Sequence, residues 1–124
     1  MQKTSKILVT GAKGFLGKHV CEELRSKGYS NVIECANSHT ATPYFIESKT
    51  NVHCCDLRYS RSCKSLIKYT NPDVVIHLAA RVGGIGANQE NPGTFIHDNL
   101  VMGINLIDAC KDRGCKFVLA GTVC

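Results

Sequence analysis

The sequence predicts an α/β fold of the Rossmann type, a doubly wound parallel sheet that is truncated after its fifth strand. Short apolar runs alternate with longer amphipathic segments along the whole chain, and the connections between them are short. No internal repeat or low-complexity segment interrupts this order. Strand and helix in regular alternation are typical of βαβ units, whose strands lie parallel with helices on both faces. We therefore expect residues 1–124 to form one domain.

The strands are predicted from apolar runs that end near turn residues. The first run, Lys6–Thr10, is apolar enough to be covered on both faces, as parallel strands are. The other predicted strands are Asn31–Cys35, Asn51–Leu57, Val74–Ala80 and Lys116–Ala120.

The helices are predicted from apolar residues at helical spacing. After Phe15, the residues Leu16, Val20 and Leu24 recur every fourth position, and Gly28 supplies a C-terminal stop. A second helix spans Ser60–Tyr69. A third runs from Pro92 to about Arg113, with one apolar face made of Ile96, Leu100, Gly103, Ile107 and Cys110. The stretches 37–50 and 81–88 are predicted to be loops, the second because it is rich in glycine.

Three glycines connect the first strand to the first helix. Gly11, Gly14 and Gly17 are spaced three apart, between an apolar run and an amphipathic segment. The first glycine permits a tight turn and the second lets the backbone approach phosphate groups. The third lets the helix pack close to the strand, and the helix N-terminus offers free N–H groups to an anion. This order predicts a site for a dinucleotide pyrophosphate.

The end of the second strand bears on which dinucleotide binds. An acidic residue there usually holds the adenosine ribose hydroxyls, but Ala36 occupies the expected position. Glu34 is near, although strand alternation should point it away from the tip. The missing acid removes a repulsion against a ribose 2′-phosphate, and Lys13 in the glycine turn could approach that phosphate. We therefore predict NADP, with NAD as the alternative; a solvated loop lysine is the other interpretation of Lys13.

The ends of the third and fourth strands carry further candidates. Asp56 could accept a hydrogen bond from an adenine amino group with Leu57 beside the ring, or it could simply cap a turn before the next helix. The loop 81–88 follows a central strand, and open α/β sheets bind ligands at the carboxyl ends of such strands.

Composition and charge argue against several classes of protein. The chain has 44% hydrophobic and 20% charged residues, and its net charge of +5 comes from scattered basic residues. Nucleic acid is therefore not an expected partner. No apolar run reaches the length of a membrane span, and the N-terminus leaves no room for a signal peptide. The eight cysteines contain no Cys-x-x-Cys pair. We expect free thiols in a reducing cytoplasm and no metal site.

The motifs resemble those of the extended short-chain dehydrogenase/reductases, which include nucleotide-sugar epimerases and dehydratases. The resemblance lies in the turn Gly11-Ala12-Lys13-Gly14-Phe15-Leu16-Gly17, in Asp56-Leu57 and in His77-Leu78-Ala79-Ala80, and it covers essentially the whole chain. The stretch Ala79–Asn88, followed by Pro92, Phe95, Ile96 and Asn99, is similar to the branch of NADPH-dependent epimerase/reductases that act on GDP-4-keto-6-deoxymannose.

The resemblance implies roles for individual residues. Thr122 matches a catalytic Ser/Thr that holds the substrate's keto oxygen, and Cys124 matches a cysteine that moves protons together with a histidine. Asn99 matches an asparagine that orders the active site. The resemblance further implies a GDP-linked sugar as substrate and a homodimer formed through helices that include the long one. The cofactor-binding residues it implies are Gly11, Lys13, Gly14, Phe15, Leu16, Gly17, Asp56, Leu57, Leu78, Ala79, Ala80 and Asn99.

The chain also departs from the family pattern. None of the four tyrosines has a lysine four residues on, so the Tyr-x-x-x-Lys pair of the family is absent. The catalytic histidine and the sugar-nucleotide domain are absent too. We therefore expect an N-terminal cofactor-binding part that does not catalyse the reaction by itself. Such a part would expose apolar surface and tend to associate or partly unfold.

Overall fold

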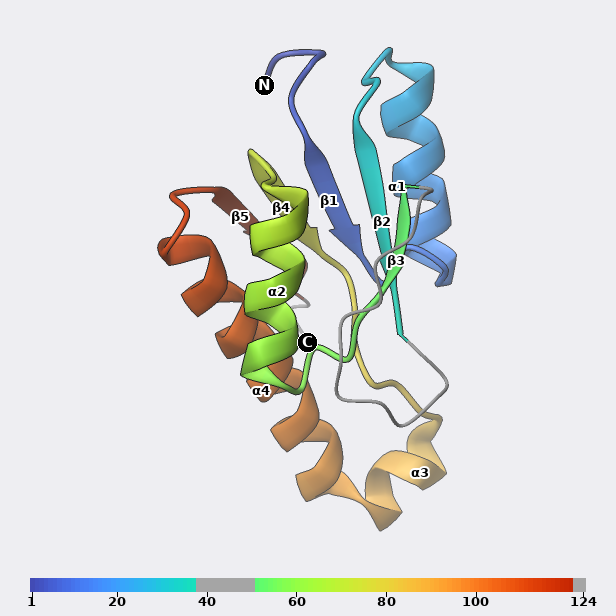
Figure 1. Cartoon of the computed structure of the whole chain (residues 1–124). Helices are drawn as coiled ribbons and strands as arrows, with labels where there is room; N and C mark the ends of the chain where they lie inside the picture. Colours follow the sequence, from blue (N-terminus) through green and yellow to red (C-terminus); the bar gives the residue numbers. More distant parts are fainter. Residues whose placement is uncertain (38–50, 122–124) are drawn as a thin grey trace.

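The structure is a computed structural model that describes residues 1–37 and 51–121. Five strands form one parallel sheet in the order β3-β2-β1-β4-β5, which confirms the predicted α/β fold (Figure 1). The strand order reverses beside β1, because β2 lies on one side of it and β4 on the other. The strands are β1 (Ile7–Thr10), β2 (Val32–Ala36), β3 (Val52–Cys54), β4 (Val74–His77) and β5 (Lys116–Leu119).

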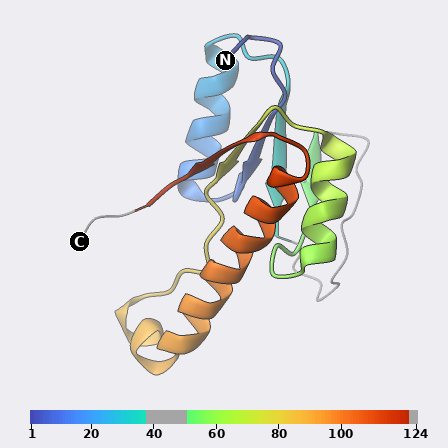
Figure 2. The same cartoon turned by 90° about the vertical axis from the view of Figure 1, so that its left-hand side faces the viewer.

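The helices cover both faces of the sheet. The first helix, α1 (Phe15–Ser26), lies on one face, while α2 (Ser60–Thr70) and α4 (Pro92–Lys111) lie side by side on the other (Figure 2). Each face has its own core. Ile7 and Val9 pack with Cys21 on the α1 side, whereas Leu8 and Val75 pack with Leu66 and Leu106 on the other side. All four residues of β1 are fully buried, as a central parallel strand requires.

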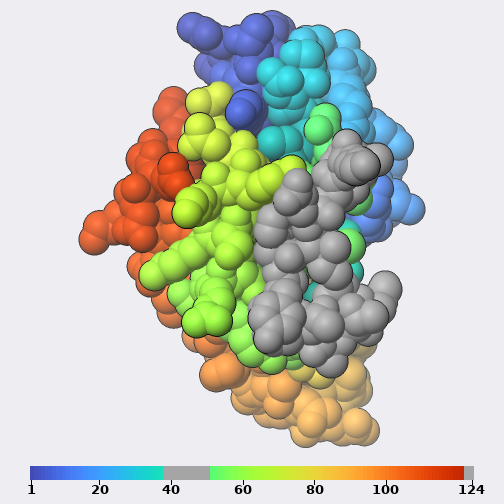
Figure 3. Space-filling view, viewed as in Figure 1, coloured from blue at the N-terminus to red at the C-terminus, as the bar shows by residue number. Residues whose placement is uncertain are grey.

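A short helix replaces part of the loop predicted at 81–88. This helix, α3 (Ile85–Glu90), begins after Gly84, so two of the glycines precede the helix and only Gly86 lies within it. The Asn88 side-chain amide donates to the Gly83 carbonyl at 3.0 Å and fixes the turn before the helix. The prediction of a loop was wrong here because the glycines mark the helix start. The helix and the first turns of α4 project beyond the carboxyl ends of the strands (Figure 1), and this segment forms the lower end of the molecule in the space-filling view (Figure 3).

Two predicted helix faces need correction. Leu16 was expected on the inward face of α1, but it is 52% exposed. Val20 and Leu24 do pack against the core on this side, and the buried residues of the helix are Gly17 and Cys21. In α4 the buried residues are Asp98, Leu106, Ala109 and Cys110, so most of the predicted apolar face is exposed. A helix that is apolar on two sides has no single inward face in its sequence pattern.

Candidate cofactor site

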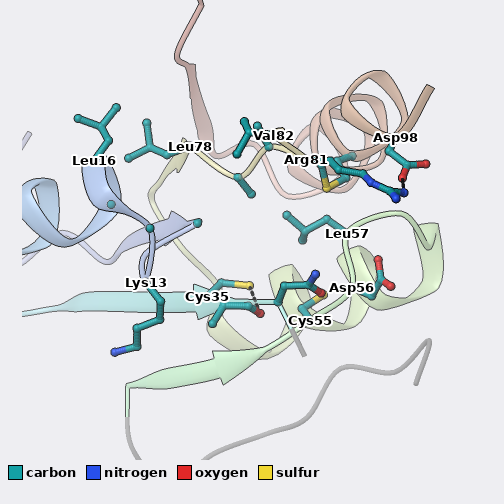
Figure 4. Close-up of a pocket in the computed structure, with 18 of the residues that line it drawn as sticks. Lys13, Leu16, Cys35, Cys55, Asp56, Leu57, Leu78, Arg81, Val82 and Asp98 are labelled. Carbon is teal, nitrogen blue, oxygen red and sulfur yellow. Dashed lines mark hydrogen bonds and ion pairs between the residues drawn. The ribbon is translucent and has the colours of Figure 1, made fainter. Parts of the chain in front are cut away.

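A cavity of about 840 Å³ lies at the carboxyl ends of the strands. It is bounded by the turn after β1, the end of β2, the segment after β3 and the loop after β4 (Figure 4). Every cofactor-binding residue predicted from the sequence lines it except Asn99. The lining residues that were predicted are Gly11, Lys13, Gly14, Phe15, Leu16, Gly17, Asp56, Leu57, Leu78, Ala79 and Ala80.

The glycine turn is as closely packed as a pyrophosphate cradle requires. Gly11 has a φ of +69°, and a Cβ atom there would lie 2.7 Å from the amide nitrogen of Ala79. A Cβ on Gly17 would collide with the Gly11 carbonyl and come within 2.7 Å of the Ala12 Cα. The first turn of α1 therefore packs directly on the turn that leaves β1. Its free N–H groups and positive dipole end face the cavity, where an anion would be stabilised.

Lys13 is engaged in an ion pair on the α1 side of the sheet. Its ammonium group lies 2.6 Å from Oε2 of Glu34, and the Arg25 guanidinium lies 2.6 Å from Oε1. Burial alone would raise the pKa of Glu34, but the two cations outweigh it and hold that pKa below its usual value. In Figure 4 the Lys13 side chain extends away from Leu57 and Asp56. The lysine is thus paired with a carboxylate, while its side chain is 54% exposed.

Asp56 has the structural role that was one of its two predicted interpretations. Its carboxylate accepts from the Arg58 backbone N–H at 3.1 Å and from the Arg58 guanidinium at 3.0 and 2.7 Å. These bonds hold the pKa of Asp56 below its usual range. The β3 strand ends at Cys54, earlier than predicted, because this turn begins directly after Cys55.

A second arginine of the cavity wall is fixed by a buried carboxylate. Asp98, on α4, lies 2.6 Å from the Arg81 guanidinium and 3.8 Å from that of Arg58. The Arg81 backbone N–H also donates to Oδ1 of Asn99 at 2.7 Å, and the Asn99 amide donates back to the Arg81 carbonyl at 3.1 Å. Asn99 therefore acts by holding the loop after β4, one step from the cavity.

Sequence reasoning missed a buried hydrogen-bond network beneath the cavity. The Thr10 hydroxyl lies 2.7 Å from Nδ1 of His77 and 3.3 Å from the Ala79 amide nitrogen. The hydroxyl oxygen accepts from the Ala79 amide and also pairs with Nδ1 of His77, which donates or accepts according to the imidazole tautomer. Burial lowers the pKa of His77 and so favours the neutral imidazole. The sequence signal for this network was that two buried strands end in polar residues, Thr10 and His77, at the same edge of the sheet.

Two predicted catalytic residues, Thr122 and Cys124, lie outside the described residues. Within the described part of the chain, Cys21, Cys35, Cys54, Cys55, Cys63, Cys110 and Cys115 are free thiols. No group of metal-ligating side chains occurs in residues 1–37 and 51–121, and none of the helices described there could cross a membrane.

The arrangement suits an extended ligand that carries an anionic group. The helix terminus and close-packed glycines offer an anion site. Apolar side chains from the β2 end, the segment after β3 and the loop after β4 line the rest of the cavity, among them Ala36, Leu57, Leu78, Ala80 and Val82. Apolar walls with a few placed polar groups are typical of cofactor sites.

Comparison with known proteins agrees with this geometry. A family model described as "NAD dependent epimerase/dehydratase family" matches residues 7–124. The chain is similar to a GDP-L-colitose synthase of Yersinia pseudotuberculosis, with 36% identity over 92% of the chain and 32% of that protein. It is also similar to a GDP-L-fucose synthase of Azorhizobium caulinodans, with 35% identity over 86% of the chain and 29% of that protein.

A solved structure shares the fold. A GDP-mannoheptose C4 reductase from Campylobacter jejuni with NADP bound superposes with a TM-score of 0.74 and 25% identity, over 96% of the chain and 33% of that protein. The chain thus spans about a third of the length of the proteins that it matches.

Proposed function

The chain belongs to the NAD dependent epimerase/dehydratase family, and from this premise we propose that it is the cofactor-binding part of an NADP-dependent epimerase/reductase acting on a GDP-linked sugar. The proposed enzyme resembles GDP-L-fucose synthase. The observation that carries the proposal is the glycine cradle that lines the cavity, where a Cβ on Gly11 or Gly17 would meet backbone. Glycines packed in this way are typical of turns in which the main chain closely approaches phosphate groups.

The lining residues divide the cavity among the parts of a dinucleotide. Gly11 and Gly14 would let the pyrophosphate approach the main chain, and the first-turn residues Phe15, Leu16 and Gly17 would hold it through backbone N–H groups. The segment Asp56-Leu57 would flank the adenine. Leu78, Ala79 and Ala80 would line the path toward the nicotinamide, with Asn99 holding their loop through Arg81.

A nicotinamide dinucleotide supplies hydride exchange at a carbonyl carbon when it is bound. The proposal assigns the chain's own catalytic work to residues at its carboxyl end. Thr122 would donate a hydrogen bond to the keto oxygen of the sugar. Cys124 would exchange a proton at a carbon beside that carbonyl, in concert with a histidine outside this chain. A Tyr-x-x-x-Lys pair outside these 124 residues would complete the site.

The preference for NADP rests on charge. Lys13, Arg25 and Glu34 together carry one net positive charge beside the end of β2, and Ala36 offers no carboxylate to repel a 2′-phosphate. The pairing of Lys13 with Glu34 weakens this attraction, so a site for NAD is the alternative. The GDP-linked substrate is favoured by the relatives named for GDP-sugar chemistry.

The assembled enzyme is further proposed to be a cytoplasmic homodimer. The exposed side of α4 carries Ile96, Leu100, Ile104 and Ile107, each close to half exposed or more. A continuous apolar stripe of this kind marks an interface. Free thiols at every described cysteine fit a reducing compartment.

The function is tested on the natural polypeptide that carries these residues. Incubated with NADPH and GDP-4-keto-6-deoxymannose, it should oxidise NADPH and give a 4-hydroxy product epimerised at neighbouring carbons. A Cys124→Ser variant should reduce the ketone without that epimerisation. Turnover with UDP-linked sugars alone, or with NADH in preference to NADPH, would overturn the assignment. A polypeptide that binds NADPH but turns over neither class of sugar would be a binding module instead.

A further inference from the structure

Asp56 and Arg58 both line the cavity beside Leu57, but only the arginine is substantially exposed. The Arg58 side chain is 43% exposed, whereas the Asp56 side chain is 7% exposed. Figure 4 shows Asp56 and Leu57 together on the segment that follows β3. The polar atoms that this pair offers to a ligand in the cavity therefore belong mainly to Arg58.

The Asp56 carboxylate is largely occupied by Arg58. Its Oδ1 accepts from the Arg58 backbone N–H at 3.1 Å and from Nε at 3.0 Å, and its Oδ2 accepts from Nη2 at 2.7 Å. A carboxylate offers about four lone-pair positions, and these three hydrogen bonds use most of them. Asp56 is thus poorly placed to serve a ligand directly, and its main effect is on the arginine.

The same contacts fix the Arg58 guanidinium in one orientation. Two parallel hydrogen bonds hold its plane against Asp56, and the buried carboxylate of Asp98 on α4 lies 3.8 Å from Nη1. This separation is longer than a hydrogen bond, so Asp98 attracts Nη1 without taking its protons. A guanidinium held in this way loses little further rotamer freedom when a ligand binds.

We propose that Arg58 recognises the adenine of the bound dinucleotide by donating from its guanidinium to a ring nitrogen of the base, and that Asp56 is a positioning residue for Arg58. This inference rests on the proposed function, which places the adenine beside Asp56 and Leu57. Ring nitrogens of adenine accept hydrogen bonds, and arginine commonly donates to purine edges. The sequence suggested the opposite contact, in which Asp56 accepts from the adenine amino group.

A changed base distinguishes the two contacts. Reduced nicotinamide hypoxanthine dinucleotide phosphate carries an oxygen where NADPH carries the adenine amino group. Arginine can donate to that oxygen and to the ring nitrogens, whereas a carboxylate at this edge would have lost the amino donor. Calorimetric titration of the unmodified chain should therefore give Kd values for the two nucleotides that agree within about threefold. A larger loss with the hypoxanthine nucleotide would assign the contact to Asp56 and overturn the proposal.

Substitutions measure the contribution of Arg58. Arg58→Ala should weaken NADPH binding about tenfold, because a hydrogen bond from a charged donor is lost. Arg61→Ala removes an exposed arginine of α2 and is the matched control, which should leave the Kd unchanged. An Arg58→Ala protein that binds NADPH as tightly as this control would overturn the proposal.

A double-mutant cycle tests whether Asp56 acts through Arg58. Asp56→Asn should weaken NADPH binding in the unmodified chain, but it should have no further effect in the Arg58→Ala background. A merely structural role of Asp56 would weaken binding in both backgrounds. An equal loss in both backgrounds would therefore contradict the positioning role.

The outcomes separate this inference from the proposed function. If the folded unmodified chain binds neither nucleotide, the proposed function fails and this inference fails with it. If NADPH binds but Arg58→Ala has no effect, the inference alone fails and the cofactor site stands. The comparison of the two nucleotides on the unmodified chain decides the question if a variant does not fold.

Discussion

At the residue scale, hydrogen bonds of the Thr10 hydroxyl connect β1 to the end of β4 and to the loop that follows it. This hydroxyl serves the Ala79 N–H and His77 Nδ1 at once, and it is fully buried. Thr10→Val keeps the shape but leaves both partners unsatisfied. We expect it to lower the free energy of unfolding by about 1–3 kcal/mol.

Urea unfolding measures this effect. Thr4→Val, at an exposed position, is the matched control and should change stability little. A Thr10→Val protein as stable as the control would show that the network contributes nothing.

His77 makes stability depend on pH. Burial lowers its pKa in the folded state below the ordinary 6.5, so the unfolded chain binds the proton more readily. The contribution of neutral His77 is therefore present above about pH 6.5 and is lost as pH falls below it. Unfolding free energies measured between about pH 7.5 and pH 5.5 should decrease with acid, and less steeply in His77→Gln. Identical slopes in the two proteins would exclude His77 as the cause.

Glu34 and the 2′-phosphate of NADP would compete for Lys13, and this competition should determine the preference between NADP and NAD. Glu34→Gln removes the negative charge and leaves Lys13 and Arg25 positive. We expect it to strengthen NADPH binding relative to NADH, whereas Lys13→Ala should weaken NADPH selectively. Calorimetric titration of each variant with both nucleotides gives the ratio. Equal effects on NADH and NADPH would mean that no 2′-phosphate approaches this pair.

At the element scale, the first turn of α1 must contain glycine where it meets the turn after β1. A Cβ on Gly17 would collide with the Gly11 carbonyl, whereas a Cβ on Gly103 in α4 would meet no atom within 4 Å among residues 1–37 and 51–121 outside its own helix backbone. Gly17→Ala should therefore destabilise the protein and abolish nucleotide binding. Gly103→Ala should stabilise it by about 0.5–1 kcal/mol through helix propensity. Thermal unfolding with and without NADPH distinguishes the two, and a benign Gly17→Ala would contradict the cradle.

The long helix α4 carries apolar residues on more than one side. Its inner side buries Leu106, Ala109 and Cys110, while Leu100 is 58% exposed. If the outer side is an interface, Leu100→Lys should shift sedimentation of the protein toward the monomer. Lys111→Glu, at the exposed C-terminal end of α4, is a control that should leave association unchanged. A monomer before any substitution would remove the basis for this interface.

At the scale of the whole molecule, sequence patterns predicted the sheet well because parallel strands leave a plain signal. Runs such as Ile7–Val9 and Val74–Ile76 are apolar throughout, as is typical of parallel strands covered on both faces. The spacing of Gly11, Gly14 and Gly17 likewise indicates the turn after β1, because backbone sterics decide where this turn needs glycine. These patterns are local, so they could be recognised without knowledge of the fold.

What the sequence did not reveal depends on contacts between distant residues. The pairing of Lys13 with Glu34, and of Asp98 with Arg58 and Arg81, joins different elements. The helix α3 escaped prediction because its first residues follow glycines and its fixing contact comes from the Asn88 side chain.

The central claim is that the cavity at the carboxyl ends of the strands binds NADP. Calorimetric titration of the chain with NADPH, and separately with NADH, tests it most directly. We predict one NADPH per chain, bound more tightly than NADH, with binding lost in Gly17→Ala. No binding of either nucleotide to the folded chain, or unchanged binding in Gly17→Ala, would contradict the account.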